Sequence, residues 1–125
     1  QSLYNMIFDN KDLIQKYNFV ICGKKPDYVP DKYNRFFDIN SICNTKTSVI
    51  GITIESIKRA KLTIGSQSAI PNISLLFKVP VIEWGHQKYL HTVEYNPFKT
   101  KVTFIEDIDY NIKPEKVYNE ILKLL

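Results

Sequence analysis

Hydroxyl and amide side chains follow the apolar stretch 62–64 of this chain. They belong to Ser66, Gln67 and Ser68, and a helix is expected directly after them. Free N–H groups at the start of a helix, together with the helix dipole, can hold a diphosphate. Asn72 falls in the first turn of that helix and could also reach the ligand. The alternative is that Ser68 only caps the helix and that Asn72 is an ordinary exposed residue.

A second group of functional side chains follows the apolar stretch 81–82. Glu83 could accept hydrogen bonds from ribose hydroxyls, and Trp84 could stack on a base or a sugar. His86 could donate to a phosphate or act in acid–base chemistry. The alternatives are a carboxylate turned to solvent for Glu83 and simple packing for Trp84.

A third candidate group follows the apolar run 19–22. It consists of Gly23, Lys24 and Lys25. A lysine at the carboxyl end of a strand can neutralise phosphate charge as a point cation. The alternative is a solvated loop, which Pro26 favours by barring a regular continuation.

Several other chemistries lack their sequence signatures. The chain has neither the G-x-G-x-x-G nor the P-loop pattern, and it has no G-x-S-x-G elbow. Its two histidines have no acidic partner at metal-ligand spacing, so we expect no metal site and no cofactor. No residue is assigned as the catalytic group.

Composition indicates an ordinary globular protein. The 125 residues are 44% hydrophobic and 24% charged, with a formal net charge of +4. The lysines are scattered, which argues against nucleic-acid binding. Cys22 and Cys43 lack metal-type spacing and are expected to be free thiols of a cytoplasmic protein.

The order of helical and strand patterns predicts the fold class. Helices are expected over 2–17, from Thr53 to Ala60, after Ser68 and from Pro114, with Asp9 and Asn10 favouring a break in the first. Strands are expected over 19–22, 36–39, 62–64, 81–82 and 102–105, the first of them covered on both faces. This alternation predicts one α/β domain over residues 1–125, a three-layer α/β/α sandwich with a Rossmann-like, mostly parallel sheet.

Burial can also be predicted from helical spacing. The helix after Ser68 should bury the stripe Ile70, Ile73, Leu76 and Phe77. The last helix should bury a stripe that contains Val117, Ile121 and Leu124.

The stretch AKLTIGSQSAIPNISLLFKVPVIEWG, residues 60–85, resembles the carboxy-terminal half of GT-B fold glycosyltransferases, the heptosyltransferase-like group above all. That group has an A-x-L-x-I-(G/S) strand, a short polar turn, a helix and a G-x-P-x-(V/I) step. The upstream NFVICGKKPD resembles its strand-plus-Gly segment. In this chain Ser66, Gln67 and Ser68 stand where the group has an acid and a Gly, and Lys78-Val79 replaces the Gly before Pro80. The identity of the donated sugar therefore stays open.

The resemblance implies a nucleotide-sugar donor-binding domain that passes a sugar to an unknown acceptor. The chain opens on a helix, which suggests the carboxy-terminal part of a larger two-domain protein. Any peripheral membrane contact would then be made by the missing part, and this chain alone would be inactive. The alternative is a small flavodoxin-like module that binds protein partners without catalysis. The sequence leaves the oligomeric state open.

Overall fold

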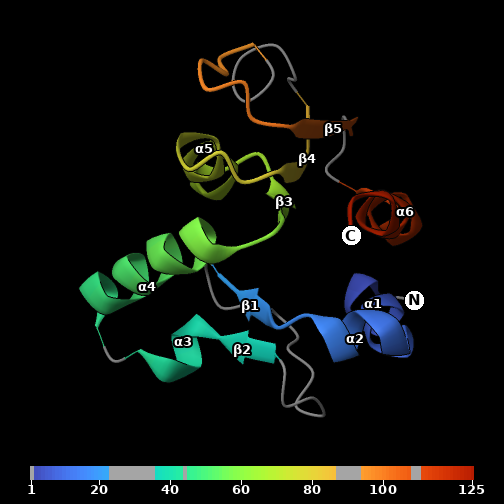
Figure 1. Ribbon diagram of the computed structural model, residues 1–125, viewed down its shortest axis with the longest axis horizontal. Helices are drawn as coiled ribbons and strands as arrows, with labels where there is room; N and C mark the ends of the chain where they lie inside the picture. Colours follow the sequence, from blue (N-terminus) through green and yellow to red (C-terminus); the bar gives the residue numbers. More distant parts are fainter. Residues whose placement is uncertain (1, 23–35, 44, 87–93, 108–110) are drawn as a thin grey trace. The chain divides into compact units, whose positions relative to one another are not determined.

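The computed structural model describes residues 2–22, 36–43, 45–86, 94–107 and 111–125 (Figure 1). These residues form a mixed α/β structure with parallel strands in two small sheets. The chain divides into two compact units, Gln1–Ser56 and Ile57–Leu125, and the division falls within one helix. Each unit is described by itself below.

The elements of the first unit are α1 (Leu3–Asp9), α2 (Lys11–Lys16), β1 (Phe19–Ile21), β2 (Phe36–Asp38), α3 (Ile39–Ile42) and most of α4 (Lys46–Arg59). The expected break in the first helix is confirmed at Asn10. Its backbone N–H donates to Ile7 at the end of α1, and its Oδ1 accepts from the Leu13 N–H at the start of α2 (3.1 Å). One residue therefore serves as both caps.

Aromatic packing holds the β1–β2 pair against α1. The ring of Phe36 stacks on Phe19 with centroids 4.6 Å apart, and it lies 4.3 Å from the ring of Phe8. The prediction that the first strand is covered on both faces is wrong, because Val20 is 44% exposed. A run of apolar residues indicates a strand, but it does not show whether helices cover both faces of that strand.

Helix α4 begins earlier than the sequence pattern indicated. Thr45 lies before it, and its Oγ1 accepts a hydrogen bond from the Ser48 N–H (3.1 Å). Thr53 lies inside the helix, so the prediction that it caps the start is wrong. The β-branched residues and Gly51 in the first half of α4 lower the local helix propensity. For this reason the sequence pattern did not indicate the first two turns of the helix.

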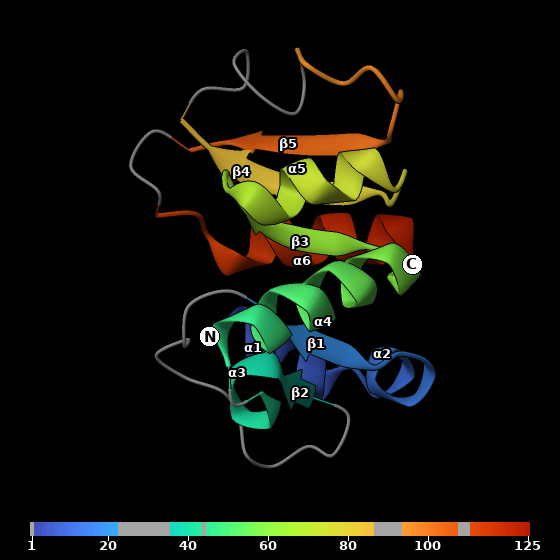
Figure 2. The ribbon, with the colours of Figure 1, turned by 90° about the vertical axis from the view of Figure 1, so that its left-hand side faces the viewer.

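The second unit contains the end of α4, then β3 (Thr63–Ser66), α5 (Ala69–Leu76), β4 (Val81–Gly85), β5 (Val102–Glu106) and α6 (Pro114–Leu124). Its sheet has the order β3-β4-β5 and is wholly parallel. Helix α5 covers one face and α6 lies behind the other (Figure 2). The predicted α/β class with three layers and Rossmann-like parallel strands is confirmed.

The strands of this unit are longer than the apolar stretches that predicted them. β3 includes Gly65 and Ser66, and β4 runs on through Glu83 and Trp84. Backbone pairing between the two strands continues as far as Ser66 and Trp84. The hydrogen-bonded ladder therefore extends beyond the hydrophobic residues. Only those hydrophobic residues indicated a strand in the sequence.

The expected inner stripe of α5 is wrong at Leu76 and Phe77, while Ile70 and Ile73 are half-buried. The buried residues of the helix are Pro71, Ser74 and Leu75, whereas Leu76 is 57% and Phe77 39% exposed. The Ser74 hydroxyl is compatible with burial because it donates to the Ile70 carbonyl (3.0 Å). The spacing of large apolar residues does not predict this buried face, because two of its three residues are a proline and a serine.

The core of the second unit centres on β4 and α6. Val81 and Ile82 are fully buried, and Val117 and Ile121 of α6 are buried as predicted, while Leu124 is half-buried. Elsewhere, Cys22 and Cys43 are free, as expected. Among the described residues no helix has the length and apolar character needed to cross a membrane.

Candidate functional site

The register of the parallel sheet brings the ends of β3, β4 and β5 to one edge. Ser66 pairs with Trp84, and Gly85 pairs with Glu106. The Gln67 N–H then donates to the Trp84 carbonyl (2.8 Å), and the Asp107 N–H donates to the Gly85 carbonyl (2.9 Å). The polar turn after β3 and the exit of β4 are therefore adjacent, at the edge where ligands bind in parallel α/β sheets.

Side-chain alternation divides the candidate residues between the two faces of the sheet. Gly65 faces α5, because a Cβ built on it would lie 4.0 Å from Pro71 Cγ. Glu83 is the register partner of Gly65 and shares this face, whereas Ser66 and Trp84 lie on the other. Glu83 and Trp84 therefore cannot act on one ligand from the same side of the strand.

Glu83 is buried in the interior of the unit. The residue is 1% exposed, and its Oε2 has no hydrogen-bond partner among the described residues. The alternative interpretation, in which this carboxylate turns to solvent, is therefore wrong, and its proposed contact with ribose hydroxyls stays a prediction. Burial raises the pKa of the Glu83 carboxyl from its ordinary 4.5 to about 7, because a charged form loses its hydration there. The group is consequently poised to be neutral or charged near physiological pH.

Gly85 leaves room for the side chain of Gln67. A Cβ built on Gly85 would collide with Gln67 Oε1 and would stand 2.7 Å from its Cγ. The Gln67 side chain therefore lies directly against the end of β4, on the face that Glu83 also occupies. Sequence analysis predicts Gln67 as a ligand-binding residue but assigns no role to Gly85.

Ser68 occupies the N-cap position of α5, yet its side chain makes no capping hydrogen bond. The interpretation of Ser68 as a simple N-cap is therefore wrong. Its hydroxyl is exposed, as is Asn72 in the first turn of the helix. The first N–H groups of α5 are thus not satisfied by the cap side chain, and Pro71 has no N–H to satisfy.

Two further residues at this sheet were missed by sequence reasoning. Thr63 Oγ1 and Asp107 Oδ2 are buried without a hydrogen-bond partner in the part of the chain that is described. Asp107 follows β5 at the same edge as His86, which is exposed after β4. The acidic pair Glu106-Asp107 directly after the last predicted strand was a signal that could have identified Asp107.

The third predicted group lies outside the described residues. Gly23, Lys24 and Lys25 belong to the segment 23–35, so their expected position beside the other two groups remains a prediction. Of the predicted site residues that are described, Ser66, Gln67, Trp84 and Glu83 lie on adjacent strand ends. Searches among protein families, curated proteins and solved structures find no match for this chain.

Proposed function

We propose that this chain is the nucleotide-sugar-binding part of a glycosyltransferase. The observation that carries the proposal is the turn after β3, where Ser68 precedes α5 without capping it. Three parallel strands end at this edge, and helix N–H groups there suit a diphosphate. The resemblance of residues 60–85 to the GT-B group supports the same ligand class.

The exposed groups define which parts of the donor would bind where. The Ser68 hydroxyl and the first N–H groups of α5 would hold the diphosphate, with Asn72 one turn further on. His86 would approach the ligand from the adjacent strand end. Gln67 would shape the floor of the site, because its side chain is packed against Gly85. The chemistry at this half is charge stabilisation of the departing diphosphate.

Titration with UDP-, GDP-, ADP- and CMP-sugars, followed by amide NMR shifts, tests the proposal. We expect one nucleotide to perturb the amides of Ser66, Gln67 and Ser68 together with that of His86. Shifts confined to α6, which lies across the sheet from α5, would contradict it. Absence of any response at millimolar nucleotide would contradict it as well, and would leave the protein-binding module as the better account.

A further inference from the structure

A second surface lies at the opposite, amino-terminal edge of the second sheet. The ends of α4 and α5 and the segment that enters β5 meet there (Figure 2, right). Six exposed residues of these segments, which we call the lysine–aromatic patch, are Lys58, Phe77, Lys78, Phe98, Lys99 and Lys101. Phe77 is 39% and Phe98 42% exposed, so each presents much of a large apolar ring to solvent.

Hydrogen bonds hold the segments of the patch together. The Leu75 carbonyl accepts from the Lys78 N–H (3.1 Å) and from the buried Thr100 hydroxyl (2.9 Å). The Val81 N–H donates to the Lys101 carbonyl (3.0 Å). The Leu75 carbonyl thus bonds both to Lys78 and to Thr100, the residue that follows Lys99. The backbones of Lys78 and Lys99 are therefore held near one another.

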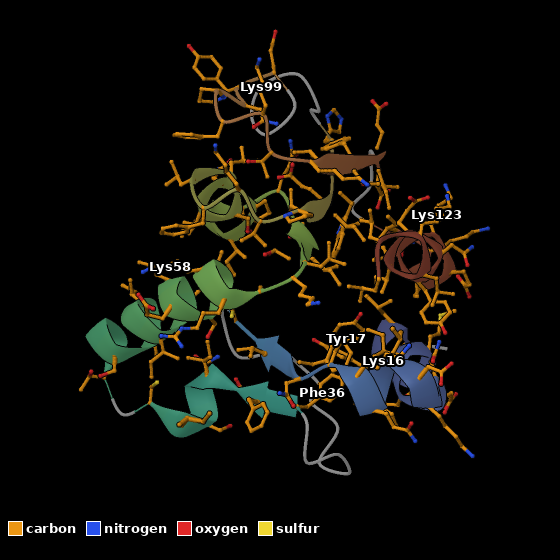
Figure 3. The ribbon with its side chains drawn as sticks, viewed as in Figure 1. Lys16, Tyr17, Phe36, Lys58, Lys99 and Lys123 are labelled. Atoms are coloured by element: carbon orange, nitrogen blue, oxygen red, sulfur yellow. The ribbon has the colours of Figure 1, made fainter. Side chains whose placement is uncertain are left out.

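Another contact ties α4 to the patch. The Lys58 ammonium lies 5.6 Å from the centre of the Phe77 ring, within the range of a cation–π interaction. Figure 3 shows Lys58 at the end of α4 and Lys99 on the segment that leads to β5. The patch therefore combines residues from three separate segments of the chain.

Two lysines of the patch adopt a backbone conformation that favours glycine. Lys78 has a φ of 56° and Lys99 a φ of 53°, both in the left-handed region. Lys78 directly follows the C-cap of α5, where glycine is the usual residue. Non-glycine residues in this region carry backbone strain, and such strain is found preferentially at functional positions. The lysine side chains are thus present in spite of a conformational cost.

Positive charge is concentrated in the three segments that carry the patch. The segments 57–61, 76–80 and 95–101 contain six cationic residues and no Asp or Glu. A small inorganic anion would bind to the lysines alone, and the exposed phenylalanines would add nothing to its binding. A lipid surface matches both features, because it offers negative headgroups and an apolar layer below them.

We propose that the lysine–aromatic patch binds an anionic membrane surface. The lysines contact the headgroups, while Phe77 and Phe98 enter the boundary between headgroups and acyl chains. This contact belongs to the chain's own residues and is independent of the nucleotide proposal. It also leaves the opposite edge of the same sheet, with Ser68 and His86, turned away from the lipid.

Vesicle co-sedimentation of the 125-residue chain tests this proposal. We expect binding to phosphatidylcholine vesicles that contain phosphatidylglycerol, weakening with salt, and little binding to phosphatidylcholine alone. The variant Lys78→Gly/Lys99→Gly should bind more than tenfold less, since each lysine contributes roughly fivefold. Its thermal stability should not fall, because glycine relieves the left-handed backbone. The variant Phe77→Ser/Phe98→Ser should lose the binding that persists at high salt.

A charge-matched control uses two exposed lysines at the start of α6. Lys113→Gln/Lys116→Gln removes the same charge and should leave vesicle binding within twofold of the unchanged protein. Equal loss in the control and in the patch variant would overturn the proposal, since binding would then follow net charge alone. Failure to bind the phosphatidylglycerol vesicles would overturn it too. The proposal would also be overturned if the protein bound soluble polyglutamate as tightly as the vesicles and Phe77→Ser/Phe98→Ser left that binding unchanged. Such a result would identify an acidic protein partner.

Discussion

The side chain of Gln67 lies where a Cβ atom on Gly85 would have to stand. Gly85→Ala should therefore displace Gln67 and destabilise the fold by about 1–3 kcal/mol, as overpacking does. Urea denaturation measures this change. In the background of Gln67→Ala the same substitution should cost less, because the colliding atoms are gone. Equal costs in both backgrounds would contradict the contact.

Gly51 provides the matched glycine control. It lies inside α4, and a Cβ built on it meets nothing within 4 Å. Gly51→Ala should stabilise the protein by about 0.5–1 kcal/mol, because alanine loses less backbone entropy in a helix. Thermal denaturation followed by circular dichroism checks the sign. Destabilisation would mean that the helix is not formed at this residue.

Burial of Glu83 predicts a pH-dependent stability. Its pKa is raised from 4.5 in the unfolded state to about 7 in the folded state. Between pH 4.5 and pH 7, the folded protein therefore keeps a proton on Glu83 that the unfolded protein has released. The stability is therefore full below about pH 4.5 and falls as the pH rises to about 7, by up to about 3 kcal/mol. Urea midpoints of the unchanged protein and of Glu83→Gln, compared from pH 4 to 8, isolate this contribution. A constant difference between the two proteins across that range would contradict it.

The missing cap at α5 can be tested against a cap that is formed. Asn10→Ala removes a hydrogen bond to the Leu13 N–H and should cost about 1 kcal/mol of stability. Ser68→Ala removes no such bond and should cost much less. If Ser68 holds a diphosphate, the same variant should weaken nucleotide binding, measured by the NMR titration. A full capping loss for Ser68→Ala would show that its hydroxyl is used within the helix.

Two buried threonines should respond differently to the same substitution. Thr100→Val removes the hydroxyl that donates to the Leu75 carbonyl and should destabilise by about 1–2 kcal/mol. Thr63→Val removes a buried hydroxyl without a partner in the described chain and should be neutral or stabilising. Chemical denaturation of both variants checks the contrast. A similar loss in both would mean that Thr63 has a partner.

Much of the fold could be predicted from local patterns. The Asn10 break, the parallel α/β order and the buried face of α6 follow from residues close in the chain, because helix caps and hydrophobic periodicity act over a few positions. The start of α4 could not be found in this way. Its capping residue Thr45 resembles any other threonine until its hydroxyl meets the Ser48 N–H.

The candidate site was predicted only in part. Ser66, Gln67 and Ser68 were identified because they are polar residues between an apolar stretch and a helix, although Ser66 is the last residue of β3. The packing of Gln67 on Gly85 joins two strands and could not be seen from either one alone. Asp107 was missed for a similar reason, since its N–H bonds to β4 and not to its own neighbours.

The amino-acid sequence by itself determined the position of the polar turn after β3 and the order of the elements, apart from the short helix α3 (Ile39–Ile42), whose first residue was expected to belong to a strand. Both depend on interactions between residues that are near one another in the chain. Only the tertiary structure decided that Glu83 is buried and that Lys78 and Lys99 share one surface. Burial depends on which helix covers which face of the sheet, and the patch depends on hydrogen bonds between segments far apart in the sequence, such as Leu75 and Thr100. Such contacts have no local signature, because they exist only once the sheet has assembled.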